Sequence, residues 1–187
     1  MVSLVLTPLS GIPVVRAGGD LAQIALSGIA HSGERLQAGD VLVFAQKIVS
    51  KAEGRTVNLA TVMPSARAFE LAQQTGKDAR LVELILQEST EIVRQRQDLL
   101  IVRHRLGFSL ANAGIDSSNV DGSDSVLLLP VDPDGSAARI RTAIREHTSV
   151  DVGVLIIDSV GRPWRMGTVG IAIGLRPMGK NALQKFF

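Results

Sequence analysis

Cysteine and tyrosine are absent from this chain of 187 residues, and tryptophan occurs once. The lack of cysteine excludes disulfides, a thiolate nucleophile and cysteine-bound zinc. Aromatic residues make up only 3% of the sequence, so the core has to be built from aliphatic side chains. The histidines, at positions 31, 104 and 147, include no close pair, which argues against a histidine-rich metal site.

Long apolar runs are also missing. None reaches the roughly 18 residues that a membrane span requires, and the apolar start lacks the basic region and cleavage site of a signal peptide. The net charge is only +2, and no basic block interleaved with aromatics indicates nucleic-acid binding. We therefore expect a cytoplasmic protein that binds neither membrane nor nucleic acid.

What the sequence does contain is hydrophobic periodicity typical of a mixed α/β fold (α+β, with a mixed sheet). The region at about 56–98 is expected to be mostly helical. Asp20 and Ser136 are expected to cap helices, and residues 46–54 to form a polar loop or a further strand. The predicted strands are 2–6, 41–45, 99–102, 126–129, 152–157 and 169–173, and the predicted helices are 20–29, 65–75, 78–95 and 137–147.

Two loops carry the residues best suited to chemistry. Asp158 directly follows the apolar run 152–157, so it should lie at the carboxyl end of a buried strand, where ligands gather in α/β sheets. Its carboxylate and the hydroxyl of Ser159 suit Mg²⁺ or Mn²⁺, and Arg162 and Arg165 could neutralise phosphate. From these residues alone, a turn cap with solvated arginines is an equal alternative.

The other loop is Asn112-Ala-Gly-Ile-Asp-Ser-Ser-Asn119. Asp116 can bind a cation and Asn119 can bond a base, a ribose or a phosphate, although such a segment alone is more often only a turn. Two carboxylate loops in one chain favour Mg²⁺, which one or two carboxylates, water and phosphate commonly hold. Lys51 could reach a phosphate, but a solvated lysine is the simpler interpretation. The sequence has neither a P-loop nor a Gly-x-Gly-x-x-Gly motif.

Several segments, taken in order, resemble the coenzyme F420-0:γ-glutamyl ligase family over residues 1 to about 174. The resemblance implies a ligase-like α/β fold and a GTP-dependent amide ligation. GTP would phosphorylate the terminal carboxylate of coenzyme F420-0, and the amine of L-glutamate would then attack the acyl phosphate. The matching segments are Pro8–Val15, Gly39–Val43, Ile48–Arg55, Ile85–Ser89, Asn112–Asn119, Leu128–Ala137 and Asp158–Gly174.

The resemblance also implies site residues and partners. Asp116 and Asp158 would bind one divalent cation, and Ser159 a second, with Mg²⁺ or Mn²⁺ at both sites and K⁺ assisting. Gln46 stands where the family would have Ser. No catalytic residue is assigned, and a homodimer is expected. The residues matching GTP contacts are Pro13, Val14, Val15, Arg16, Gln46, Lys51 and Asn119.

The end of the chain departs from this pattern. Residues 175–187 do not resemble the family's continuation, so we expect a ligase-like domain at 1–174 and a divergent tail at 175–187. An out-of-frame or artificial tail and a natural truncation both remain open. We expect the GTP and metal site to be incomplete in this chain, with weak or no activity. The alternative function is a non-catalytic nucleotide- and metal-binding or assembly module, and a third is a related ligase acting on another carboxylate.

Overall fold

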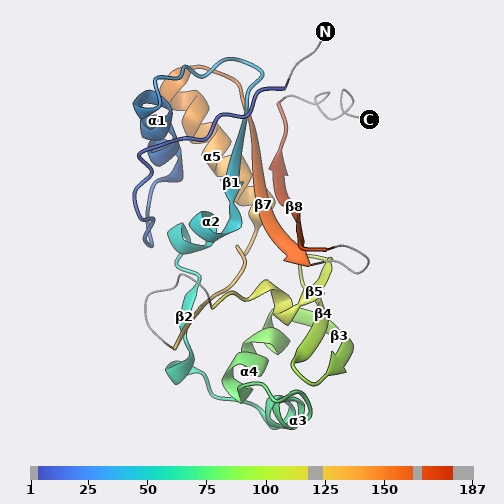
Figure 1. Cartoon of the computed structure of the whole chain (residues 1–187). Coiled ribbons are helices and arrows are strands. Elements are labelled where there is room, and N and C mark those ends of the chain that lie inside the picture. Colours follow the sequence, from blue (N-terminus) through green and yellow to red (C-terminus); the bar gives the residue numbers. More distant parts are fainter. Residues whose placement is uncertain (1–3, 118–123, 162–165, 179–187) are drawn as a thin grey trace. The chain divides into compact units, whose positions relative to one another are not determined.

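The computed structural model describes residues 4–117, 124–161 and 166–178, and the chain forms two compact units (Figure 1). Unit 1 comprises Met1–Gly54, Pro130–Asp158 and Ala172–Phe187. Unit 2 comprises Arg55–Leu129 and Ser159–Ile171. The chain thus crosses between the units four times, after Gly54, Leu129, Asp158 and Ile171.

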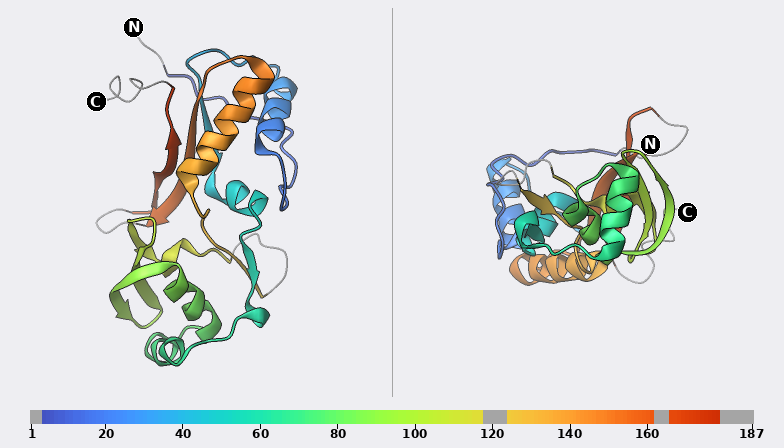
Figure 2. Two further views of the ribbon diagram at one scale, coloured as in Figure 1. Left: turned by 180° about the vertical axis from the view of Figure 1, so that it is seen from behind. Right: turned by 90° about the horizontal axis from the view of Figure 1, so that it is seen from below.

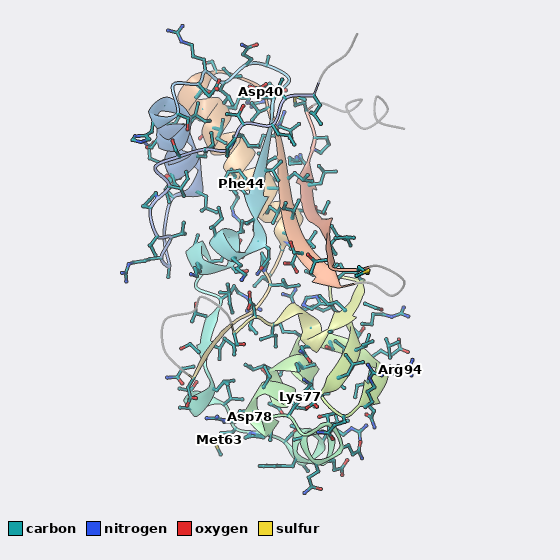
Figure 3. The ribbon with its side chains drawn as sticks, in the orientation of Figure 1. Asp40, Phe44, Met63, Lys77, Asp78 and Arg94 are labelled. Atoms are coloured by element: carbon teal, nitrogen blue, oxygen red, sulfur yellow. The ribbon has the colours of Figure 1, made fainter. Side chains whose placement is uncertain are left out.

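A three-stranded sheet has the order β1 (Val41–Ala45), β7 (Gly153–Gly161) and β8 (Thr168–Arg176). β1, β7 up to Asp158 and β8 from Ala172 belong to unit 1. β1 and β7 are parallel, in a register that runs from Val41 opposite Gly153 to Ala45 opposite Ile157. Phe44, labelled in Figure 3, is buried, whereas Val41 and Val43 are exposed. This alternation follows from the two-residue period of a strand.

Helices α1 (Leu21–His31) and α5 (Pro133–Thr148) pack on each other in unit 1 and lie side by side in both views of Figure 2. Asp20 accepts a hydrogen bond from the Gln23 amide and caps α1, which confirms its predicted role. The short helix α2 (Gln46–Ala52) follows β1 directly. The core of unit 1 is aliphatic apart from Phe44, and it is centred on Val49, Ile140, Ile144, Val152, Val154 and Ile156.

In its described residues, unit 2 combines two α-helices with two antiparallel sheets. One sheet pairs β2 (Thr56–Asn58) with β6 (Ser125–Leu127). The other has the order β3 (Ser89–Arg96), β4 (Leu99–His104) and β5 (Ser109–Ala111). The 3₁₀ turns η1 (Leu59–Thr61) and η2 (Asn112–Gly114) follow β2 and β5.

The helices of unit 2 are α3 (Ala66–Thr75) and α4 (Ala79–Gln87), which pack on each other. Ser65 and Asp78 cap them by accepting hydrogen bonds from backbone amides of Ala68 and Arg80. Gly76 ends α3 with a φ of 69°, a conformation that glycine adopts without steric cost. Two adjoining apolar clusters, one around Leu71, Val82 and Ile85 and one around Leu59 and Val126, form the core.

The mixed α/β fold class is confirmed, with five α-helices in the described part of the chain. Both predicted helices between 56 and 98 are present, but the second ends at Gln87 and not at 95. Residues from Ser89 onward form β3, because Thr90, Ile92 and Val93 favour a strand and Ile92 pairs with Val102 of β4. The apolar residues keep a helical spacing as far as Ile92, although α4 ends at Gln87.

Three further local predictions were wrong. Residues 4–6 of the predicted first strand form no strand, and Leu4 and Leu6 are exposed; alternation makes a strand only where a neighbouring strand takes its hydrogen bonds. Residues 46–54, expected to form a polar loop or a further strand, contain helix α2, which is too short for its period to stand out. α5 begins at Pro133 and is capped by Asp132 instead of Ser136, since proline suits the first helical position.

Within the described residues, no helix has both the length and the apolar character that crossing a membrane demands.

Candidate functional site

Two of the predicted site residues of unit 1 directly follow the paired stretches of β1 and β7. Ala45 and Ile157 are parallel register partners, and the next residues are Gln46, which begins α2, and Asp158. Asp158 is half-buried and continues the row of β7 side chains to which buried Val154 and Ile156 belong. The sequence predicted that Asp158 begins a loop after the strand, but β7 continues to Gly161, so this carboxylate lies within the strand, one residue beyond the stretch that pairs with β1.

Helix α2 carries Gln46 and Lys51. The Gln46 side chain is buried, and its Nε2 donates to Oγ of buried Ser50 at 2.7 Å. This bond links positions four residues apart on one helix face, so part of the amide's hydrogen-bonding capacity serves the fold. Lys51 is half-buried in the last turn of the same helix.

The turn 13–16 lies in the same unit. Val15 is buried in the core of unit 1, whereas Pro13, Val14 and Arg16 are exposed. The carbonyl of Arg16 accepts a hydrogen bond from the Gly19 amide at 3.0 Å, and the Gly18 amide donates to the carbonyl of Ala52 at 2.8 Å. The segment after the predicted GTP-contacting turn is therefore bonded to the end of α2, one residue beyond Lys51.

Ser159 follows Asp158 on β7, in the part of the strand that belongs to unit 2. Successive residues of a strand point to opposite faces, and Ser159 is exposed where Asp158 is half-buried. The two side chains thus cannot turn to the same face of the strand, which is compatible with ligands of two different ions and not with ligands of a single one.

Asp116 lies in unit 2, after a strained turn. Asn112, Ala113 and Gly114 have consecutive φ values of 52°, 53° and 68°, all in the left-handed region. The backbone of Asp116 is then fixed in both directions by Leu127: its amide donates to the Leu127 carbonyl at 3.0 Å, and its carbonyl accepts from the Leu127 amide at 2.8 Å. Such strain persists where the surroundings hold it, and it clusters at functional sites.

The donor chemistry of these residues fits a hard cation. Carboxylate and hydroxyl oxygens are the groups that Mg²⁺ and Mn²⁺ take. Asp116 and Asp158 are both half-buried; Asp116 is anchored by its backbone pairing with Leu127, and Asp158 lies within strand β7. Over residues 4–117, 124–161 and 166–178, no three His, Asp or Glu side chains gather to hold a metal ion. Asn119, Arg162 and Arg165 lie outside the described residues.

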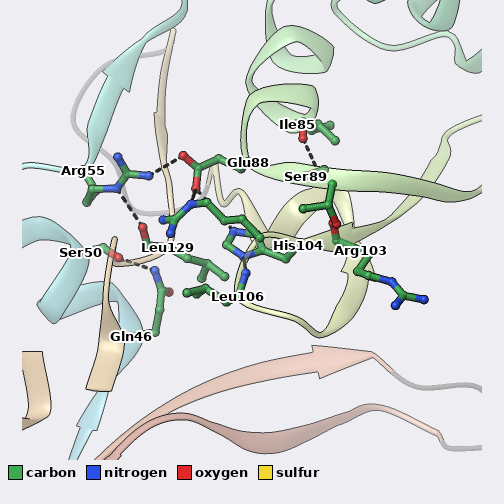
Figure 4. A network of polar contacts seen from close by, with 12 residues as sticks. Gln46, Ser50, Arg55, Ile85, Glu88, Ser89, Arg103, His104, Leu106 and Leu129 are labelled. Carbon is green, nitrogen blue, oxygen red and sulfur yellow. Dashed lines mark hydrogen bonds and ion pairs between the residues drawn. The ribbon is translucent and has the colours of Figure 1, made fainter. Parts of the chain in front are cut away.

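A polar cluster in unit 2 was missed by sequence reasoning (Figure 4). Oε1 of Glu88 accepts from Nη2 of Arg55 at 2.7 Å, and Oε2 accepts from Nε of Arg105 at 2.9 Å. His104 is buried, and its Nδ1 accepts from the Leu106 amide at 3.0 Å. The ring proton is therefore on Nε2, which lies 3.5 Å from Oε2 of Glu88, beyond ordinary hydrogen-bond length.

Electrostatics hold the Glu88 carboxylate in its charged form. Burial alone would raise the pKa of Glu88, but the contacts with His104 and Arg55 and the charges of Arg55 and Arg105 outweigh it and lower the pKa to about 2. The sequence did contain a signal: Glu88 interrupts the row of apolar residues that starts at Leu81. A charged residue in an apolar row has to find partners, although the sequence does not say which.

Comparison with known proteins gives the chain its relatives. The family model described as F420-0:gamma-glutamyl ligase matches residues 11–184. A coenzyme F420:L-glutamate ligase of Methanothermobacter thermautotrophicus is 47% identical over 88% of this chain and 65% of its own length. An enzyme of the same name from Methanopyrus kandleri is 50% identical over 86% of this chain and 61% of its own length. Another, from Archaeoglobus fulgidus, is 44% identical over 90% of this chain and 65% of its own length.

The chain thus spans less than two thirds of the length of the relatives it matches. The family match itself runs over most of the chain, and it includes the loops with Asp116 and Asp158 and the segments that hold Arg55 and Glu88. On this evidence the chain belongs to the F420-0:gamma-glutamyl ligase family.

Proposed function

We propose that this chain acts in the GTP-dependent ligation of L-glutamate to coenzyme F420-0 in the cytoplasm, as a homodimer. The observation that carries the proposal is the family match, together with relatives named coenzyme F420:L-glutamate ligase at 44–50% identity. The half-buried positions of Asp116, after the turn 112–114, and of Asp158, within β7, are consistent with it.

In the proposed reaction, the terminal carboxylate of F420-0 attacks the γ-phosphorus of GTP, and GDP leaves. The amine of glutamate then attacks the acyl carbon, the C–O bond to phosphate breaks, and the amine loses a proton. Phosphoryl transfer of this kind depends on positioning and on neutralising charge. Divalent cations, Mg²⁺ or Mn²⁺, supply that neutralisation when bound, and K⁺ assists.

The residues of this chain have separate parts in the proposal. Asp116 and Asp158 hold one cation through carboxylate oxygens, and Ser159 holds the second through its hydroxyl. Lys51 contributes a point charge for phosphate, and the turn 13–16 contacts the nucleotide. Gln46 has a smaller part than its position suggested, because its amide is bonded to Ser50. Asn119 is included on resemblance alone.

Two measurements on the purified chain test the proposal. Calorimetry with GTP in Mn²⁺ and K⁺ should give binding that disappears when EDTA removes the divalent metal. Mass spectrometry of F420-0 incubated with GTP and L-glutamate should detect a product larger by one glutamyl residue, and omission of GTP should abolish it. Metal-dependent GTP binding without the product would support the non-catalytic module instead, and neither signal would refute both.

A further inference from the structure

A carboxylate in unit 1 lies beside the residues proposed to contact GTP, and the proposed site does not use it. Glu53 follows α2 directly, two residues after Lys51. The residue before it, Ala52, accepts through its carbonyl from the Gly18 amide at 2.8 Å. Because Gly18 comes just after the turn 13–16, this bond joins the end of α2 to the segment that leads out of that turn.

The partners of Glu53 come from the start of helix α5, also in unit 1. Nη2 of Arg139 donates to Oε1 of Glu53 at 3.0 Å and to Oγ of Ser136 at 2.9 Å. The Ser136 hydroxyl donates to the same Oε1. Ser136 is buried and the Glu53 side chain is only 20% exposed, whereas that of Arg139 is 66% exposed. The ion pair is thus anchored on its inner side, and its guanidinium is open to solvent.

This ion pair keeps one acceptor and several donors available. Among the described residues, every hydrogen bond to the Glu53 carboxylate is accepted by Oε1, and none by Oε2. Arg139 likewise donates to those residues only through Nη2, so Nε–H and the two N–H groups of Nη1 are not engaged by them. A carboxylate oxygen accepts from an ammonium group, and a guanidinium donates to a carboxylate. An α-amino acid carries both of these groups on one carbon atom.

We propose that Glu53 and Arg139 bind the amino-acid substrate. Oε2 of Glu53 accepts from its α-ammonium group, and the outer N–H groups of Arg139 donate to its α-carboxylate. Ser136 is the positioning residue, because it bonds to both side chains from the first turn of α5. This inference rests on the proposed function, which makes L-glutamate the substrate whose amine attacks the acyl phosphate. It brings that amine close to the nucleotide contacts and uses none of the proposed cation ligands.

The test measures binding to the whole chain without GTP or divalent metal, so its failure is distinguishable from failure of the ligase proposal. L-glutamate is titrated by calorimetry at constant ionic strength, beside glutarate, which lacks the amine, and 4-aminobutyrate, which lacks the α-carboxylate. Saturable binding of L-glutamate is expected. Each analogue should bind about tenfold more weakly or worse, because a hydrogen bond to a charged group is lost. No saturable binding of L-glutamate, or equal affinity for glutarate, would overturn the inference, even if GTP binds in Mn²⁺.

Variants locate the site. Glu53→Gln keeps the size of the side chain but removes its charge, so it should weaken L-glutamate binding by about tenfold or more and abolish the preference over glutarate. Arg139→Lys, at an exposed position that tolerates substitution, should also weaken binding, because the guanidinium geometry is lost. Glu146→Gln and Arg145→Lys, both exposed on α5, are the matched controls and should bind as the wild type does.

A purely structural ion pair gives a different result. Glu53→Gln would then lower the melting temperature and leave the preference for L-glutamate over glutarate unchanged, and Arg139→Lys would bind with wild-type affinity. That combination would show that Glu53 and Arg139 only join α2 to α5.

Discussion

Ala45 of β1 is the parallel register partner of Ile157 of β7, and each is followed at once by a residue of the candidate site. This pairing fixes the position of Asp158 along the strand direction relative to Gln46, the first residue of α2. No loop separates either residue from the paired strands. Because Asp158 lies within β7, its carboxylate has little freedom to retreat from a bound cation. Substitution of Asp158 should therefore affect ligand binding far more than folding.

Asp158→Asn should weaken GTP binding in Mn²⁺ by about 100-fold or more. Removing a group that hydrogen-bonds to a metal ligand lowers metal affinity by up to about 100-fold, and removing the metal ligand itself should lower it at least as much. The amide has the size of the carboxylate, so the melting temperature should stay near that of the wild type. Calorimetry with and without Mn²⁺ measures the effect. Asp98→Asn, on a left-handed turn residue where asparagine is tolerated, is the control. Unchanged affinity in Asp158→Asn would remove Asp158 from the site.

The Glu88 cluster should make unit 2 sensitive to acid. Because the pKa of Glu88 is lowered from 4.5 to about 2, its contribution to stability is complete above pH 4.5 and is lost as the pH falls towards 2. The shift corresponds to about 3 kcal/mol. Glu88→Gln should remove this part of the pH dependence, and hydrogen exchange of β3 and β4 amides between pH 2 and 5 measures it.

The control for that experiment is Glu91→Gln, since Glu91 is 56% exposed in its pair with Arg103 and surface pairs contribute little. Its exchange profile should follow the wild type throughout. If Glu88→Gln and the wild type lose protection in parallel over the same pH range, Glu88 is not the group responsible.

The sequence predicted which helices and strands are present more accurately than the residues at which they begin and end. Strong runs such as 152–157 and capped segments such as the helix after Asp20 were recognisable, because burial and capping leave local signals. The end of α4 was not, since the apolar period continues through Ile92 into β3. Which partners Glu88 takes depends on pairing between β3 and β4, and on Arg55 lying 33 residues earlier. Such contacts are decided by tertiary structure, which periodicity does not record.

The strained turn before Asp116 should depend on Gly114. Its φ is 68°, and a Cβ there would lie 2.9 Å from Leu110 and 3.0 Å from Leu129. Gly114→Ala should thus destabilise unit 2 by about 2 kcal/mol or more, from strain and crowding together. Gly33→Ala, with a φ of 72° and open space around its Cβ position, should show the strain alone. Equal losses of unfolding free energy in urea would mean that packing against the two leucines is unimportant.

Gly174 of β8 tests how this strand is docked in unit 1. A Cβ at this position would lie 2.6 Å from the carbonyl oxygen of Pro133, at the start of α5. The neighbouring amide of Leu175 donates to Asp134 of the same helix at 2.7 Å, so the strand has little room to move away. Because the obstacle is backbone, Gly174→Ala should destabilise unit 1 by about 1–3 kcal/mol.

Gly170→Ala is the matched control on the same strand, since nothing lies within 4 Å of its Cβ position. Alanine there should be neutral or slightly stabilising, because it restricts the unfolded chain. Urea unfolding of both variants gives the comparison, and a second substitution, Asp134→Ala, removes the acceptor for Leu175 without adding bulk. If Gly174→Ala unfolds like Gly170→Ala, β8 is free to shift, and the close approach of Gly174 to Pro133 does not fix the strand.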